Sequence, residues 1–311
     1  MSKAGPSKDR ARRIPGTVGL ALEESLLFER GAPGREGYSL PSDEALPEAD
    51  FGTSGLESHL IRDELSGMPE LTEFDVIRHF TRLAGWNYCI DAGFFPLGSC
   101  TMKYNPKVHE LIAGLPGIAG GHPYTPEVFA QGALGILYEL QELLIKITGM
   151  HSCTLEPAAG AHGELTGMMM IRAYHEAKGN KKTKVIIPNS AHGTNPATAA
   201  LCGYKVVEVK ARESGILHYD DVKDLIDDEV AAIMLTNPNT VGLFERDVAK
   251  IAKALDAVDA RFYCDGANLN ALMGQASFGK MGVDVSQINL HKTYSTPHGG
   301  GGPGSGALVV S

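Results

Sequence analysis

In the second half of the chain, short apolar runs rich in β-branched residues alternate with longer stretches in which apolar residues recur every three or four positions. The short runs are typical of buried strands, and the longer stretches are typical of amphipathic helices. The predicted strands are residues 152–155, 185–187, 204–209, 231–235, 261–264, 286–290 and 307–310. The predicted helices between them are residues 164–178, 219–227 and 246–258. Because crossovers between such strands are right-handed, this order predicts an α/β fold with a mostly parallel sheet and helices on both faces.

The first half of the chain carries fewer signals of regular structure. The clearest is residues 132–148, where leucine and isoleucine recur at helical spacing up to a glycine, which commonly ends a helix. A shorter amphipathic helix is predicted over residues 70–79, and the two prolines of residues 93–106 indicate a loop. Residues 1–60 are rich in Gly, Pro and charge, so we expect an extended arm there and one large domain over residues 61–311.

The composition favours a globular protein that has neither nucleic acid nor a membrane as a partner. The chain has 311 residues, of which 43% are hydrophobic, and this is enough for a sizeable core. Its 28 Lys and Arg residues against 37 Asp and Glu residues give a formal charge of -9. The chain therefore lacks the positive field that attracts phosphate backbones and anionic lipids. No apolar run comes near the roughly 20 residues of a membrane-spanning helix, so we expect a soluble protein.

The five cysteines are widely spaced and form no C-x-x-C pair. This pattern suggests neither a zinc site nor a secreted disulfide framework, so we expect no metal site and a cytoplasmic location. The first 13 residues are basic but lack the apolar stretch of a secretory signal. A solvated basic tail is the commoner explanation of such a run, and an organellar presequence stays open as the alternative.

Polar, glycine-rich segments directly follow the predicted strands, and in a parallel sheet such segments meet at one edge. Residues 156–163 are one of them and include Gly160 and Ala161. Small side chains there let backbone N–H groups approach an anion at a helix N-terminus. The alternative is that the turn only lets a strand pack closely on its helix. The segment lacks the G-K-[ST] ending of a P-loop and does not match G-x-G-x-x-G.

Two further loops of this kind carry His192 with Thr194, and Asp265. His192 could stack its ring on a flat heteroaromatic ligand, although a hydrogen-bonded loop histidine is the commoner case. Asp265 comes at the end of a predicted strand. An aspartate there either caps the next turn or holds a protonated pyridine nitrogen by a charge-assisted hydrogen bond. The second role needs a lysine nearby.

That lysine is Lys292, which follows the predicted strand at residues 286–290 and comes one crossover after Asp265. A lysine in this setting can form a Schiff base with a pyridine cofactor, whose ring is an electron sink for a carbanion at the substrate's α-carbon. Most lysines are only solvated surface charges, so the combination with Asp265 and His192 carries the prediction. A run of four glycines at residues 299–302 is costly in entropy unless the backbone must bend or move near a ligand.

With these residues assembled, the chain resembles glycine decarboxylase, the P-protein of the glycine cleavage system, and in particular the B subunit of its two-subunit form. The resemblance covers nearly everything after residue 25, and its motifs are long and in order. They are FER at residues 28–30, FPLGSCTMKYNP at 95–106, the loops that begin at Glu156 and Ser190, LTNPNT at 235–240, DGAN at 265–268 and the segment 291–306.

The resemblance implies the large domain of a fold-type-I enzyme that uses pyridoxal 5'-phosphate (PLP). By matching position, Lys292 would bind the cofactor covalently, Asp265 would pair with its pyridine nitrogen, and His192 would stack on its ring. Gly160 and Ala161 would offer backbone amides to its phosphate. The further neighbours that the resemblance implies are Thr194, Asn268 and His291.

The implied reaction is the decarboxylation of glycine, in which carbon dioxide is released and the aminomethyl group passes to the lipoyl group of the H-protein. The implied assembly pairs two B chains with two A subunits. The loop at residues 96–106 resembles the family's segment near the substrate and lipoyl-arm entrance. The family continues beyond the position of Ser311 with a C-terminal part that includes a smaller domain, so we expect that domain to be missing. The alternatives are another fold-type-I PLP decarboxylase or aminotransferase, and a truncated, non-catalytic pairing subunit.

Overall fold

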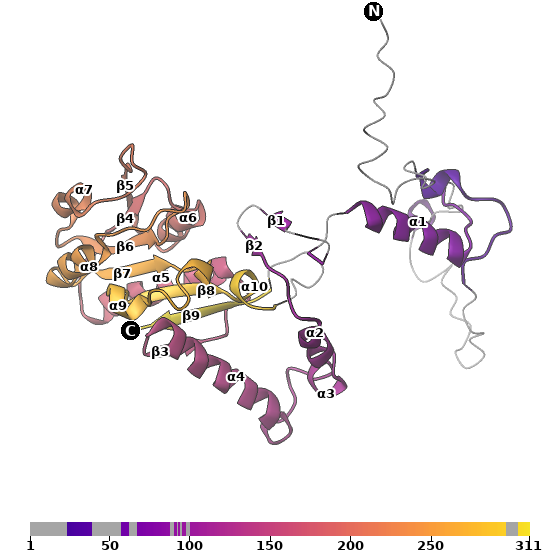
Figure 1. The fold of residues 1–311 in the computed structure, drawn as a ribbon, viewed down its shortest axis with the longest axis horizontal. Coiled ribbons are helices and arrows are strands. Elements are labelled where there is room, and N and C mark those ends of the chain that lie inside the picture. The colour runs from indigo at the N-terminus through magenta and orange to yellow at the C-terminus, as the bar shows by residue number, and fades with distance from the viewer. Residues whose placement is uncertain are drawn as a thin grey trace, which may run out of the picture. The chain divides into compact units, whose positions relative to one another are not determined.

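The computed structural model describes residues 24–38, 57–61, 67–87, 90–91, 93, 95–97, 100–296 and 304–311. The chain, drawn in Figure 1, divides into two compact units, Met1–Cys89 and Ile90–Ser311. Most of the arm expected over residues 1–60 lies outside the described residues, so the domain division made from the sequence stays a prediction.

The first unit is built around helix α1, Glu73–Trp86. Thr72 caps this helix, because its hydroxyl oxygen accepts a hydrogen bond from the backbone N–H of Asp75 at 3.4 Å. The buried carboxylate of Glu24 pairs with Arg82 and with Arg30, whose nitrogen lies 2.6 Å away. The helix predicted over residues 70–79 is present as α1, but it begins and ends later in the sequence than predicted. Short 3-10 turns are found at Leu27–Glu29 and Ser58–Leu60.

The second unit contains a seven-stranded sheet in the order β3-β9-β8-β7-β6-β4-β5. The strands β5, β4, β6, β7 and β8 pair in parallel, whereas β9 pairs antiparallel with both β8 and β3. The bounds are β3 Ser152–Thr154, β4 Lys184–Pro188, β5 Lys205–Val209, β6 Val230–Thr236, β7 Arg261–Asp265, β8 Val285–Asn289 and β9 Gly306–Val310. The predicted mostly parallel sheet is confirmed.

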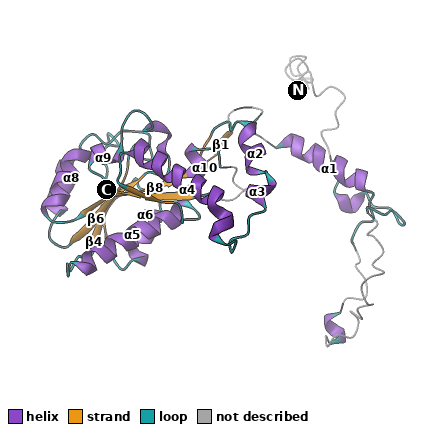
Figure 2. Ribbon diagram, turned by 90° about the horizontal axis from the view of Figure 1, so that it is seen from below, coloured by secondary structure: helices purple, strands orange, loops and turns teal. Residues whose placement is uncertain are grey.

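Helices cover both faces of this sheet, as predicted. Figure 2 shows α5 and α6 on one side and α8 and α9 on the other. A cluster that includes Met168 and Ile171 fills the first interface, and a larger cluster around Ile251, Leu255 and Phe262 fills the second. The helices are α5 Gly160–Ala177, α6 Thr194–Leu201, α7 Tyr219–Val222, α8 Val248–Ala257, α9 Phe278–Met281 and α10 Leu290–Thr293, with 3-10 turns at Lys223–Leu225 and Leu269–Ala271.

Two expectations about individual elements need correction. The helix predicted over residues 219–227 is wrong in length, since α7 ends at Val222 and a 3-10 turn follows. The loop predicted over residues 93–106 contains a small hairpin of β1, Phe95–Leu97, and β2, Cys100–Met102. Before the sheet come α2 Lys107–Ala113, α3 Pro116–Ala119 and α4 Glu127–Thr148.

Helix α4 is, within the described part of the chain, long and apolar enough to cross a membrane by length and composition. The expectation that no segment approaches that length is therefore wrong by this test. The C-terminal part of α4 packs on protein: Leu144 and Thr148 are buried, and Gln141 Nε2 donates to the backbone oxygen of Cys153 at 2.8 Å. One such helix is weak support for a membrane partner.

We expect Gly167→Ala, in α5, to destabilise the protein by about 1–3 kcal/mol through overpacking. A Cβ at Gly167 would lie 2.8 Å from the Tyr263 ring and 2.9 Å from Val285, both on strands of the sheet. The matched control is Gly135→Ala in α4, where no atom lies within 4 Å; it should stabilise the helix by about 0.5–1 kcal/mol. Urea unfolding midpoints of the two variants should move in opposite directions, and a neutral Gly167→Ala would contradict the close packing.

Candidate functional site

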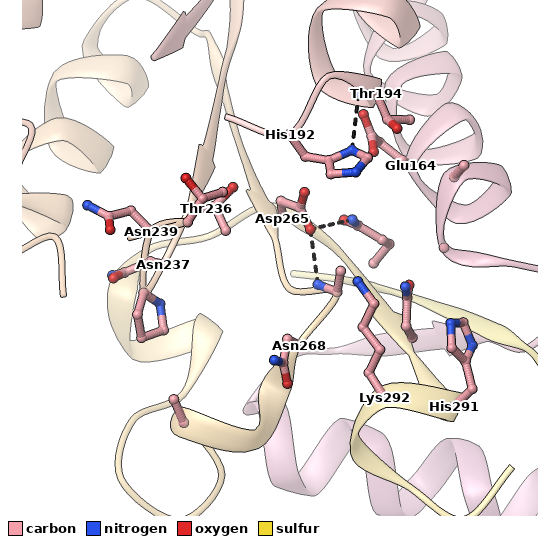
Figure 3. Close-up of a pocket in the computed structure, with 18 of the residues that line it drawn as sticks. Glu164, His192, Thr194, Thr236, Asn237, Asn239, Asp265, Asn268, His291 and Lys292 are labelled. Atoms are coloured by element: carbon pink, nitrogen blue, oxygen red, sulfur yellow. Dashed lines mark hydrogen bonds between the residues drawn. The ribbon is translucent and has the colours of Figure 1, made fainter. Parts of the chain in front are cut away.

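A cavity of about 820 Å³ opens at the carboxyl ends of the parallel strands. It is lined by the residues that follow β3, β4, β6, β7 and β8, several of which Figure 3 labels. All eight site residues predicted from the sequence are among them: Gly160, Ala161, His192, Thr194, Asp265, Asn268, His291 and Lys292. The structure thus brings together residues that are more than a hundred positions apart in the sequence, while their individual roles stay predictions.

Asp265 is the last residue of β7 and is 6% exposed. Its Oδ1 accepts hydrogen bonds from Gln287 Nε2 at 2.6 Å and from the backbone N–H of Ala267 at 3.0 Å. The Tyr263 hydroxyl donates in turn to Gln287 Oε1 and fixes that amide. Two N–H donors at one oxygen hold the orientation of the carboxyl group. Figure 3 shows it facing the cavity.

Lys292 lies on α10, the short turn that begins directly after β8. The turn is anchored by backbone contacts: Lys103 Nζ donates to the backbone oxygen of His291 at 2.7 Å, and the Leu269 N–H donates to the Thr293 hydroxyl at 3.0 Å. The half-buried Lys292 side chain extends into the cavity toward the loop after Asp265 (Figure 3). The structure therefore presents an amine and a carboxylate to the same space.

The N-terminus of α5 forms another wall of the cavity. Its N-cap residue, Ala159, offers no side-chain cap, so the first N–H groups of the helix have no partner from a capping residue. Gly160 lies so close to the buried Asn289 amide that a Cβ there would come within 1.9 Å of Asn289 Oδ1. Unpaired N–H groups and the positive end of the helix dipole favour a phosphate or another anion at this place.

His192 stands in the loop between β4 and α6 and is exposed at the opening of the cavity. Its Nδ1 accepts a hydrogen bond from the backbone N–H of Thr194 at 3.2 Å, so that nitrogen carries no proton in this arrangement. The bond fixes the ring while leaving its face open, as a residue that stacks on a flat ligand requires.

Sequence reasoning missed several polar residues of the cavity, above all Glu164 and Gln287. Glu164, on the second turn of α5, is 2% exposed. Burial, together with the negative charge of Asp265, raises its pKa to about 8 against a partial lowering by a hydrogen bond with Thr198. Gln287 could have been suspected, because it is one of several polar residues in a fully buried strand. Among the described residues, no group of three His, Cys, Asp or Glu side chains could hold a metal ion.

Comparison with known proteins gives one consistent result. The family model described as "Glycine cleavage system P-protein" matches residues 57–311. A relative from Kosmotoga olearia, named "Probable glycine dehydrogenase (decarboxylating) subunit 2", is 55% identical over 288 residues, and one of the same name from Listeria innocua is 54% identical over 292. These alignments cover 91% and 93% of this chain but 59% of each relative, so the chain spans well under two thirds of their length.

Solved structures show the same fold. A crystal structure of glycine decarboxylase (P-protein) of the glycine cleavage system, in inhibitor-bound form, superposes with a TM-score of 0.62 at 23% identity, and covers 100% of this chain and 63% of that one. A sphingosine-1-phosphate lyase from Burkholderia pseudomallei gives 0.58 at 16% identity, over 80% of this chain and 60% of that one. The predicted fold class, the large domain of fold-type-I enzymes, is confirmed.

We expect Gly160→Ala to weaken the binding of inorganic phosphate by about tenfold or more, because the new Cβ must displace Asn289 or the N-terminus of α5. Loss of one charge-assisted hydrogen bond, about 1.5–3 kcal/mol, has this effect. Gly193→Ala is the matched control, since no atom lies within 4 Å of a Cβ there. Calorimetric titration with phosphate measures both variants; equal affinities would contradict an anion site at this helix end.

Proposed function

The chain belongs to the family of glycine cleavage system P-proteins, and from that premise we propose that it binds PLP through Lys292 and serves the decarboxylation of glycine. One observation carries the proposal: an amine, a buried carboxylate and a free helix N-terminus line the same cavity. The relatives that cover most of this chain are named as glycine dehydrogenases (decarboxylating), and these names support the same activity.

The donor set of the cavity fits PLP, which carries an aldehyde, a basic ring nitrogen and a phosphate. Lys292 supplies the amine for the aldehyde, and Asp265 supplies the negative charge for a protonated ring nitrogen. The N-terminus of α5 at Gly160 and Ala161 suits the phosphate. Neighbouring side chains that support the fit are Thr194, Asn268 and His291.

When bound, PLP supplies an electron sink for the negative charge that develops at the glycine α-carbon after carbon dioxide leaves. Asp265, oriented by Gln287, stabilises the positive ring nitrogen and so favours that charge transfer. His192 would stack on the cofactor ring. Lys292 would hold the cofactor through its amine, and because this amine lies within the cavity it could also accept or donate a proton there.

The partners follow from the same proposal. The aminomethyl group is transferred to the lipoyl group of an H-protein, and two chains of this kind pair with two A subunits. Of these partners, the name "subunit 2" of the relatives supports the existence of another subunit. Exposed apolar side chains on α4 support a protein partner, because such patches are rare on monomers. They are Val128, Phe129, Leu134, Ile136, Leu137, Tyr138 and Leu143. A cytoplasmic location is part of the proposal.

Lys292→Ala should abolish the absorbance band of the lysine-bound cofactor when the protein is incubated with PLP, because Lys292 is the one lysine among the described residues that line the cavity. The matched control is Lys280→Ala on α9, whose side chain is exposed and does not line the cavity. Absorbance spectra of the two variants and the wild type decide the matter. A band that persists in Lys292→Ala would end the assignment of the anchoring lysine.

In the presence of its A subunit and a lipoylated H-protein, the protein should exchange labelled bicarbonate into the carboxyl group of glycine. Decarboxylation can be reversed while the aminomethyl group is held by the H-protein. Label from bicarbonate should therefore enter glycine only when the H-protein is present. Omission of the H-protein is the control. Amino-group transfer to a keto acid without carrier-dependent exchange would instead indicate an aminotransferase of the same fold.

A further inference from the structure

The cavity holds a second carboxyl group, Glu164, for which the proposed chemistry has no role. Glu164 comes from α5, and its side chain points into the cavity (Figure 3). It is 2% exposed, and its Oε1 is buried without a hydrogen-bond partner. A buried acid with an unpaired oxygen is costly if it is ionised, because neither water nor a donor compensates the charge.

Glu164 and Asp265 have unequal surroundings. Asp265 Oδ1 receives two N–H donors, from Gln287 and Ala267, whereas Glu164 has a hydrogen bond only with Thr198. When two carboxyl groups share a buried site, one of them keeps its proton, and it is the one with the poorer set of donors. The arrangement therefore leaves the negative charge on Asp265 and the proton on Glu164.

We propose that Glu164 is a positioning residue that remains protonated at neutral pH and so leaves Asp265 as the single carboxylate facing the ring nitrogen of the cofactor. This inference rests on the proposed function and deepens it. A second carboxylate in the cavity would repel Asp265 and offer the protonated ring nitrogen and Lys292 a competing partner. A neutral Glu164 avoids both effects and can still donate one hydrogen bond within the cavity.

The other titratable groups that line or adjoin this space come from three elements. They are Asp265 and Tyr263 on β7, His192 in the loop after β4, and His291 and Lys292 on α10. Thr198 and the fully buried Asn195 on α6 are neutral. Of these groups, Asp265 is the one whose charge raises the pKa of Glu164, and the effect adds to that of burial.

Because the pKa of Glu164 differs between the folded and unfolded states, this residue makes the stability of the protein depend on pH. The folded protein keeps the Glu164 proton up to about pH 8, whereas the unfolded chain loses it near the ordinary value of 4.5. The folded state thus binds more protons in this window, so this group makes the protein less stable as the pH rises from 4.5 to 8. Glu164→Gln, which mimics the protonated acid, should remove that part of the pH dependence.

The direct test is infrared spectroscopy of the cofactor-free protein as a function of pH. The wild type should show a protonated carboxyl band that disappears with a midpoint near pH 8. The band should be missing in Glu164→Gln and should titrate at lower pH in Asp265→Asn. Glu208→Gln, an exposed acid on β5, is the matched control and should leave the band unchanged. Titration of Glu164 in the ordinary range of carboxyl groups would overturn the proposal.

A second measurement links the proton to the cofactor. Between pH 7 and pH 9, the affinity of the wild type for PLP should fall several-fold more than the affinity of Glu164→Gln. The reason is that only the wild type gains a second carboxylate over this range. Identical pH profiles of the two proteins would also overturn the proposal. Failure of the Lys292 assignment is distinguishable, because it would appear as a cofactor absorbance band that persists in Lys292→Ala, whereas the carboxyl band is measured in the cofactor-free protein.

Discussion

The geometry of the cavity depends on the pairing of β7 with β8. In this parallel register Asp265 stands beside Gln287, and the amide of Gln287 holds the carboxylate. Tyr263, two positions earlier on β7 and so on the same face of the sheet, holds the other end of that amide. Since side chains alternate along a strand, a shift of one residue would break all of these contacts. The same pairing places Lys292, because α10 begins where β8 ends.

Close contact of α5 with the sheet is the second requirement. Gly160, Gly163 and Gly167 share one face of the helix, and a Cβ at these positions would meet Asn289, Gln287 and Tyr263 respectively. The missing side chains let the helix axis approach the strands and bring its N-terminus to the level of their carboxyl ends. One packing arrangement thus forms the anion-binding wall and also directs Glu164 into the cavity.

Charge then determines what the cavity can do. The positive helix end, the carboxylate of Asp265 and the amine of Lys292 come from different elements, and each matches a different group of the proposed cofactor. Because Asp265 and Glu164 are buried, their interactions with neighbouring charges are stronger than they would be in water. An additional buried charge would therefore have a large effect, and this is why the protonation state of Glu164 matters.

By itself, the sequence determined the alternation of strands and helices, the mostly parallel sheet and the positions of Asp265 and Lys292 after strands, because these follow from local periodicity and from the general rule that loops meet at one sheet edge. It also carried the motifs by which the family is identified.

Local patterns could not show that α7 stops after Val222, since neighbouring contacts decide where a helix ends. Only the tertiary structure revealed Gln287 beside Asp265, Asn289 against Gly160, and Glu164 in the cavity. Those contacts join segments that are far apart in the chain, and strand register and packing fix them rather than any property of the adjacent residues.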